Sequence, residues 1–442
     1  MEPEWPKVDF IVGNPPFLGG KFLRRELEDT YVDQLFACWN GRVPAEADIC
    51  CYWFEKARAH IERGRCWRAG LLATQGIRGG ANREVLKRIQ ESSSIFWAIS
   101  DKDWILDGAN VHVSLIGMDD GTEKTRTLDG KLVSTINANL SAATDTTQAR
   151  ILPQNQGISF MGDTKVGPFE IPETLAREWL TLRNPNGKSN TDVVRPWANG
   201  PEIMRTPQRL WIVDFPLGMS EAKAAQYEAP FEYIRKHVKP LRADNNRRVY
   251  AERWWIHAEA RPELRKSISV LPRFIATTRV SKHRVFVWVN NNVLPDCALI
   301  AFARADDYFF GILHSRPHEI WSLAQGSQLR EKESGFRYTP TTCFETFPFP
   351  SPTPAQEQAI AEAARALDTA RQNWLGDRSD KKRTLTTLYN EKPTWLVDTH
   401  RKLDGAVFEA YGWDANINDE AILQKLLELN MLRSAPLVSV TA

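Results

Sequence analysis

The feature that most constrains this chain is a short apolar run followed at once by a pair of prolines. Residues 8–12 have the composition of a buried parallel strand, and Gly13-Asn14-Pro15-Pro16-Phe17 follows them directly. Successive prolines fix the backbone and remove N–H donors, so a helix or strand cannot continue through them. The chain must therefore turn where this first strand ends. A buried strand also needs neighbours on both sides, and very little sequence precedes this one.

The residues that follow alternate between strand-like and helix-like stretches. Buried strands are expected at residues 68–74, 95–100 and 111–118, and helical periodicity covers residues 47–61 and 83–89. Strand, loop, helix and strand in this rhythm are typical of an α/β sheet with crossover helices. The first part of the chain is therefore predicted to be an α/β domain.

The rest of the chain changes character twice. A polar, irregular stretch at residues 121–164 indicates a domain boundary. Residues 165–350 are dense in Arg and aromatic side chains, with short strands expected at 274–278 and 285–289. Beyond the proline-rich residues 344–350, amphipathic helices are expected at 353–374, 397–411 and 419–433. The predicted domains are residues 1–164, 165–350 and 351–442.

The charge of the chain is unevenly distributed. Hydrophobic residues make up 42% of the sequence and charged residues 25%, which excludes a disordered chain, and the net charge is only +2. Residues 233–285, however, contain fourteen Lys and Arg against four Asp and Glu, a local net charge of +10. Such a block is typical of proteins that bind a phosphate backbone, although the same arginines could pair with acids from elsewhere in the chain.

The cysteines and the apolar runs restrict the compartment. None of the six cysteines belongs to a C-x-x-C pair, and the eight histidines show no metal-ligand spacing, so no metal site is predicted. The sequence contains no run of 18 apolar residues and no apolar segment near Met1 that could act as a signal peptide. The chain is expected to be soluble and cytoplasmic, with reduced thiols and no membrane partner.

Residues 14–17, here named the NPPF loop, carry groups suited to chemistry at a nucleobase amino nitrogen. That nitrogen is a weak nucleophile because its lone pair is delocalised into the ring, and two acceptors for its hydrogens would free the lone pair. The side-chain oxygen of Asn14 and the carbonyl of Pro15, stiffened by Pro16, can serve as these acceptors. Phe17 offers a flat face on which an extruded base can stack. The predicted catalytic residues are Asn14, Pro15, Pro16 and Phe17.

Two other interpretations of these patterns remain open. Asn-Pro and Pro-Pro pairs are also common in plain turns, so the four residues alone are a weak signal. Asp214 with Glu221 and Lys223 imitates the spacing of a metal-dependent nuclease. However, Ser220 is expected to cap a helix that begins at Glu221, whereas a nuclease site of this type lies on strands.

Taken together, several segments resemble a known family. They are residues 9–21, 47–57, 70–83, 104–109, 336–338, 347–350, 411–413 and 427–430. The chain resembles adenine-specific, S-adenosylmethionine-dependent DNA methyltransferases with an Asn-Pro-Pro-aromatic motif. More narrowly, it is similar to the methyltransferase and specificity portions of the MmeI-like restriction–modification family.

This resemblance implies a fold, a reaction and partners. The fold would be a partial Rossmann-like methyltransferase sheet without its N-terminal strands, then an α+β target-recognition domain and a C-terminal helical segment. Asn14 and Pro15 would hold the adenine amino group of double-stranded DNA, and Phe17 would stack on the flipped base. The methyl group would pass directly from S-adenosyl-L-methionine to nitrogen, without a covalent enzyme intermediate.

One departure from the family affects the cofactor. Its members carry a Gly-x-Gly loop before the catalytic motif, and no such loop stands in this sequence. The cofactor-binding motif is therefore expected upstream of Met1, on a polypeptide that completes the domain. A non-catalytic DNA-binding specificity module is the alternative function, and methylation of RNA or protein is a third.

The contacts with DNA are predicted in two groups. Base contacts are expected from Gln328, Arg330, Lys332 and Arg337, which lie in or near a polar stretch rich in groups that can read base edges. Lys282 and Arg284 are expected to contact phosphates, which position a protein without specifying sequence. Each of these side chains could also be an ordinary surface residue. His314 and His318 flank Arg316 and are expected to pack or cap, without a chemical role.

Overall fold

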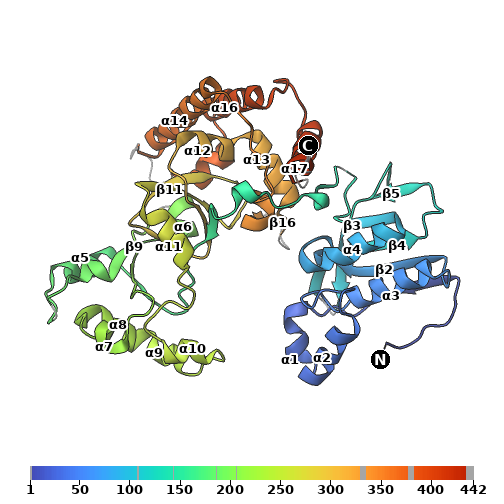
Figure 1. Cartoon of the computed structure of the whole chain (residues 1–442), viewed down its shortest axis with the longest axis horizontal. Coiled ribbons are helices and arrows are strands. Elements are labelled where there is room, and N and C mark those ends of the chain that lie inside the picture. Colours follow the sequence, from blue (N-terminus) through green and yellow to red (C-terminus); the bar gives the residue numbers. More distant parts are fainter. Residues whose placement is uncertain are drawn as a thin grey trace, which may run out of the picture. The chain divides into compact units, whose positions relative to one another are not determined.

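The structure of the chain is a computed structural model, which describes residues 2–106, 109–142, 144–185, 187–205, 207–328, 335–376 and 383–434. These residues form two compact units, Met1–Gln148 and Ala149–Ala442. They are named here the N-terminal unit and the C-terminal unit (Figure 1). The finer division into three domains, with boundaries at residues 164 and 350, stays a prediction. In the described part of the chain, no helix is both long enough and apolar enough to cross a membrane.

The N-terminal unit is built on a six-stranded sheet in the order β1-β2-β4-β3-β5-β6. Its strands are β1 (Phe10–Gly13), β2 (Arg68–Thr74), β3 (Ser94–Leu106), β4 (Ala109–Asp119), β5 (Arg126–Leu128) and β6 (Lys131–Val133). Its α-helices are α1 (Leu23–Glu26), α2 (Asp29–Cys38), α3 (Cys51–Glu62) and α4 (Gly80–Ser92). β1 and β2 run parallel, whereas β4 is antiparallel to β2 and β3. The predicted α/β fold is therefore confirmed.

The sheet of this unit buries one face better than the other. Helices α3 and α4 pack against each other, and the core beneath them contains Leu71, Ile116 and the partly buried Ile11. Alternate side chains of a strand point to opposite faces, so Phe10 and Val12 point away from this core. They are 60% and 86% exposed. The expectation that the first strand is buried is wrong among the described residues, because β1 is an edge strand whose neighbour there is β2.

Among its described residues, the C-terminal unit contains three small sheets, in the orders β14-β9-β10-β8, β13-β11-β15-β7 and β12-β17-β16. Its strands are β7 (Ser159–Met161), β8 (Glu170–Ile171), β9 (Val194–Ala198), β10 (Trp211–Val213), β11 (Arg273–Thr278), β12 (Val280–Ser281), β13 (Phe286–Asn290), β14 (Leu294–Pro295), β15 (Leu299–Phe302), β16 (Ser327–Gln328) and β17 (Phe336–Arg337). Its α-helices are α5 (Glu173–Thr181), α6 (Gly200–Met204), α7 (Glu221–Ala224), α8 (Glu228–His237), α9 (Lys239–Ala243), α10 (Arg248–Glu252), α11 (Pro262–Ser269), α12 (Asp307–His314), α13 (Arg316–Gln325), α14 (Pro354–Gly376), α15 (Leu385–Glu391), α16 (Thr394–Tyr411) and α17 (Asp419–Ser434).

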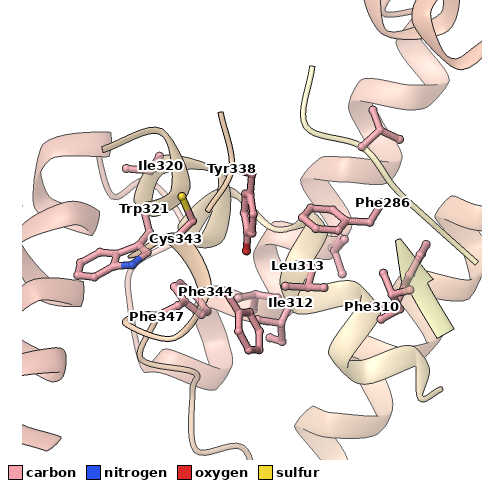
Figure 2. Packing of buried hydrophobic residues seen from close by; sticks show 14 of the residues in the cluster. Phe286, Phe310, Ile312, Leu313, Ile320, Trp321, Tyr338, Cys343, Phe344 and Phe347 are labelled. Carbon is pink, nitrogen blue, oxygen red and sulfur yellow. The ribbon is translucent and has the colours of Figure 1, made fainter. Parts of the chain in front are cut away.

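The main core of the C-terminal unit lies between the β13-β11-β15-β7 sheet and the helices that follow it. Phe286 of β13 and Phe310 of α12 are buried in it together with Trp321 and Tyr338 (Figure 2). Helices α12 and α14 approach closely at Gly311, where a Cβ atom would lie 2.9 Å from Ile360 Cγ2. The predicted C-terminal helices are therefore part of the same core as the strands before them.

Three of the sequence motifs in this unit meet in space. The hydroxyl of Tyr411 donates a hydrogen bond to the carbonyl of Pro348 over 2.9 Å. The buried side chain of Asn430 donates to the carbonyls of Thr346 and Arg150, over 2.6 and 2.8 Å. Because these polar groups satisfy one another away from water, their role is to hold the last helices against the preceding chain.

Candidate functional site

The NPPF loop begins where β1 ends. Gly13, the last residue of β1, pairs in register with Leu71 of the parallel strand β2, so the loop leaves the sheet at the carboxyl ends of two parallel strands. Asn14 and Pro16 are exposed, Phe17 is half-buried and Pro15 is buried. This edge is where open α/β sheets bind their ligands. The structure thus places all four predicted catalytic residues in one accessible loop at such an edge.

The polar groups of this loop are available for a ligand. Within the described residues, neither the side chain of Asn14 nor the carbonyl of Pro15 has a hydrogen-bond partner in the protein. Two cysteines at the start of α3, Cys50 and Cys51, are buried. A hydrogen bond to Cys50 and burial raise the pKa of Cys51 well above its usual value, so its thiol stays protonated at neutral pH. The loop therefore presents acceptors, and Cys51 is not poised as a thiolate nucleophile.

The predicted base contacts lie in and around the three-stranded β12-β17-β16 sheet. Gln328 pairs in register with Phe336, and Arg337 lies opposite both Val280 and Ser327. Arg337 is exposed, as is Lys282, which directly follows β12. The fold therefore brings Lys282, Gln328 and Arg337 close together. Arg330 and Lys332 lie outside the described residues.

Arg284 is in a different environment from these residues. Its guanidinium group is buried and donates hydrogen bonds to the carbonyl of Thr278, to the hydroxyl of Thr277 and to the carbonyl of Phe336. Burial lowers the pKa of Arg284 to about 10. This arrangement is typical of an arginine that holds neighbouring segments together, and it favours a structural role over the predicted phosphate contact.

The basic block at residues 233–285 is also partly neutralised within the fold. Arg242 is buried and donates to carbonyl groups, among them that of Ile256 over 2.7 Å. Exposed members of the block pair with acids on their own or neighbouring helices, such as Arg235 with Glu232 at 2.5 Å and Arg248 with Glu252 at 2.6 Å. The local charge of +10 therefore overstates how many cations face a ligand.

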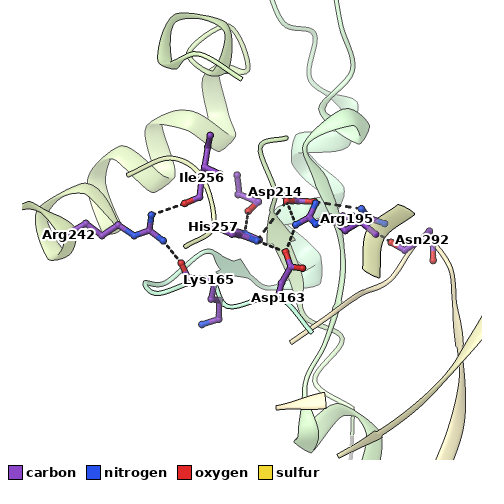
Figure 3. A network of polar contacts seen from close by, with 10 residues as sticks. Asp163, Lys165, Arg195, Asp214, Arg242, Ile256, His257 and Asn292 are labelled. Carbon is purple, nitrogen blue, oxygen red and sulfur yellow. Dashed lines mark hydrogen bonds and ion pairs between the residues drawn. The ribbon is translucent and has the colours of Figure 1, made fainter. Parts of the chain in front are cut away.

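Asp214, the acid of the nuclease-like spacing, belongs to a buried network (Figure 3). Arg265 of α11 donates to Asp214 over 2.7 Å and also pairs with Asp163, while Nδ1 of His257 lies 3.3 Å from Asp163. Burial alone would raise the pKa of Asp214, but the charges of His257 and Arg265 lower it. Arg265 thus neutralises two of the three residues that could otherwise hold a metal ion.

The rest of the nuclease-like pattern lies on a helix. Ser220 caps α7, where its side chain accepts a hydrogen bond from the backbone N–H of Lys223. The predicted N-cap is confirmed, and this observation counts against a strand-borne nuclease site at Glu221 and Lys223.

Two residues near the NPPF loop were assigned no role from the sequence. Asp48 and Asn82 are joined by a 2.7 Å hydrogen bond across 34 positions of the chain. A pair so far apart leaves no signal in spacing or periodicity. The crossover between β1 and β2 brings the backbone N–H of Asp48 to the side-chain oxygen of Asn82.

Comparison with known proteins agrees with this geometry. The family described as "MmeI, DNA-methyltransferase domain" matches residues 3–129, and the family "MmeI, target recognition domain" matches residues 175–351. DNA methyltransferase A of Bacillus subtilis (strain 168) is 35% identical over 127 residues, which are 28% of this chain and 13% of that protein. The solved Type IIL restriction–modification enzyme MmeI in complex with DNA superposes with a TM-score of 0.77 at 21% identity.

The coverage of that structure is unequal. The superposition covers 96% of this chain and 57% of the solved chain. This chain therefore spans little more than half the length of the solved relative and a small part of the curated one.

A methyltransferase-type α/β unit followed by a target-recognition region defines the class: the chain is of the DNA methyltransferase type. It belongs to the MmeI-like restriction–modification family, whose two domains account for most of its length. The predicted family and fold class are thereby confirmed.

Proposed function

We propose that this chain forms the catalytic and target-recognising part of an adenine-N6 DNA methyltransferase of a restriction–modification system. The observation that carries the proposal is the NPPF loop, whose exposed Asn14 and half-buried Phe17 lie where two parallel strands end. The methyltransferase and target-recognition matches on either side of residue 150 support DNA as the substrate.

The proposed chemistry follows from the groups in the loop. A flipped adenine would stack on Phe17, and its two amino hydrogens would be accepted by Oδ1 of Asn14 and by the carbonyl oxygen of Pro15. Both acceptors strengthen their hold as positive charge develops on the nitrogen, which stabilises the transition state more than the ground state. No residue of this chain needs to form a covalent intermediate.

The methyl donor proposed for this reaction is S-adenosyl-L-methionine. The residues of this chain do not fit it unaided, because the sequence has no Gly-x-Gly loop. In addition, β1 lies at the edge of the described sheet, and Phe10 and Val12 are exposed on one of its faces. We propose that a polypeptide encoded upstream pairs with this edge and supplies the cofactor loop. An unpaired, apolar edge strand is a ready template for such pairing.

The test is a methylation assay with S-adenosylmethionine carrying a labelled methyl group, on this chain co-expressed with the upstream polypeptide. Asn14→Ala is expected to lower the methylation rate by about 100-fold or more, as loss of one preorganised polar group does elsewhere. DNA affinity should stay unchanged, because recognition is assigned to the C-terminal unit. Asn40→Ala, which removes another exposed asparagine of the N-terminal unit, serves as the control. Unchanged methylation by the Asn14 variant would refute the catalytic role.

A second candidate function is a DNA-binding specificity module without catalysis of its own. The open edge of β1 is the observation that favours it. Titration calorimetry of the isolated chain with S-adenosylmethionine separates the two proposals. Tight binding by the chain alone would exclude the module and would also remove the need for an upstream partner.

A further inference from the structure

The chain just after the NPPF loop is connected to two other segments by hydrogen bonds through Asp48 and Asn82. The backbone N–H of Gly20 donates to Oδ1 of Asp48 over 2.9 Å. The backbone N–H of Asp48 donates to Oδ1 of Asn82 over 2.7 Å, and Nδ2 of Asn82 donates to the carbonyl of Gly76 over 3.3 Å. These bonds join the segment after β1, the segment before α3 and the segment after β2.

The exit of the loop is also held by its backbone. The N–H of Ile49 donates to the carbonyl of Leu18 over 2.9 Å. At Gly20 a Cβ atom would lie 2.1 Å from the carbonyl oxygen of Glu46, so the backbone lies flat against the segment that carries Asp48. The entry is held by the pairing of Gly13 in the sheet. The NPPF loop is thus fixed at both ends, while its own acceptors remain free.

We infer that Asp48 is a positioning residue for the proposed methyl transfer, and that Asn82 orients Asp48 for this task. The inference rests on the proposed function. Two acceptors can meet two amino hydrogens only if the loop is held within a fraction of an ångström, and a displacement of about 1 Å can cost roughly 100-fold in rate. A carboxylate that accepts a backbone N–H makes a charge-assisted bond, which is stronger than the neutral bonds beside it.

The first test measures hydrogen exchange in the full chain, without DNA or cofactor. Asp48→Ala removes the acceptor for Gly20, and the exchange rate of the Gly20 amide should rise about tenfold. Asp48→Asn keeps an oxygen at that position and should exchange nearly as slowly as the wild type. Glu46→Ala removes an exposed acid from the same segment and is the control. Equal exchange in Asp48→Ala and wild type would overturn the inference whatever the activity of the enzyme.

The second test uses the co-expressed enzyme and separates kcat from KM. Asp48→Ala should lower kcat by roughly tenfold or more with KM for DNA unchanged, and Asp48→Asn should restore most of the rate. A merely structural role would instead lower the thermal stability of Asp48→Ala, with no selective loss of kcat. If the wild-type enzyme methylates DNA and Asp48→Ala does so at the same kcat, the inference fails and the proposed function stands. If the wild-type enzyme does not methylate DNA at all, the proposed function fails, and the inference fails with it.

Discussion

The two units differ in what they do with their polar side chains. In the N-terminal unit, Asn14 and Pro16 of the NPPF loop are open to solvent, and the Asn14 side chain has no hydrogen-bond partner among the described residues. In the C-terminal unit Arg284, which was predicted to contact a phosphate, is buried and hydrogen-bonded to the fold. His318, which was expected to pack, is buried and hydrogen-bonded as well. The first arrangement suits chemistry on a ligand, and the second mainly stabilises the protein.

This difference shows which sequence signals to trust. A short motif fixed by prolines at the end of a strand indicates a free site, because the backbone around it is already determined. A count of positive charges does not indicate a surface, since the same residue type serves as a buried support and as an exposed contact. If the contrast is right, substitutions in the networks of the C-terminal unit change stability, and substitutions in the NPPF loop change the reaction.

The largest expected effect is a loss of stability of the C-terminal unit in mild acid. Burial lowers the pKa of His318 to about 3 and that of His400 to about 4, and burial beside Arg371 lowers the pKa of His314 well below its usual value. In the unfolded chain these histidines have pKa values of about 6.5, so they take up protons more readily than in the folded protein. Their full contribution to the free energy of unfolding is therefore present above about pH 6.5, and it is lost as the pH falls toward about 4. Each group contributes up to about 1.4 kcal/mol per pH unit.

The measurement is urea unfolding followed by tryptophan fluorescence at pH 7.5 and pH 5. Burial raises the pKa of Asp404 to about 6, so protonation of this residue stabilises the folded protein as the pH falls. This single group offsets only part of the loss from the three histidines. His318→Phe should flatten the pH dependence, and the exposed His237→Gln should leave it unchanged. Equal unfolding free energies at the two pH values would contradict the assignment of these histidines as buried neutral groups.

The next effect concerns the charged network around Arg265. Arg265→Met leaves the buried carboxylates of Asp163 and Asp214 without their main cation, and it should destabilise the C-terminal unit by about 3–5 kcal/mol. Arg248→Met removes an ion pair whose arginine is 90% exposed, and it should cost less than about 1 kcal/mol. Calorimetric scans of both variants test the contrast directly. Similar melting temperatures for the two variants would show that burial of the network does not matter.

Part of this molecule could be predicted from the sequence, and the rest depends on long-range contacts. The strands β1 to β4, helices α3 and α4 and the last helices follow from periodicity and proline positions. The pairing of β12, β17 and β16 does not, since each strand is only two residues long and no apolar alternation marks it. The burial of Arg284 and the bond between Asp48 and Asn82 depend on segments far apart in the chain. Local patterns carry no record of such contacts.

A smaller effect should separate two arginines that were both predicted to contact DNA, Arg337 at a base and Arg284 at a phosphate. Arg337 is exposed on β17 and, as a predicted base contact, should contribute about 1–3 kcal/mol of sequence preference. Sequencing of random duplexes bound by Arg337→Ala should show weaker preference at one or two positions, with an unchanged melting temperature. Arg284→Met should lower the melting temperature and leave the sequence preference unchanged, because the guanidinium group of Arg284 donates its hydrogen bonds to backbone carbonyls of the protein. Loss of preference in both variants would place Arg284 at the DNA after all.

The smallest effect is expected at Lys282, an exposed residue that directly follows β12. Its Nζ atom lies 3.4 Å from Oδ1 of Asn390. A phosphate contact adds affinity without sequence preference, so Lys282→Ala should weaken binding to all duplexes about equally. It should also reduce the slope of log affinity against log salt by about 1. Lys402→Ala, which removes an exposed lysine of α16, is the matched control. A change in sequence preference would make Lys282 a base contact, and an unchanged salt slope would mean that the +10 block reaches the backbone through other residues.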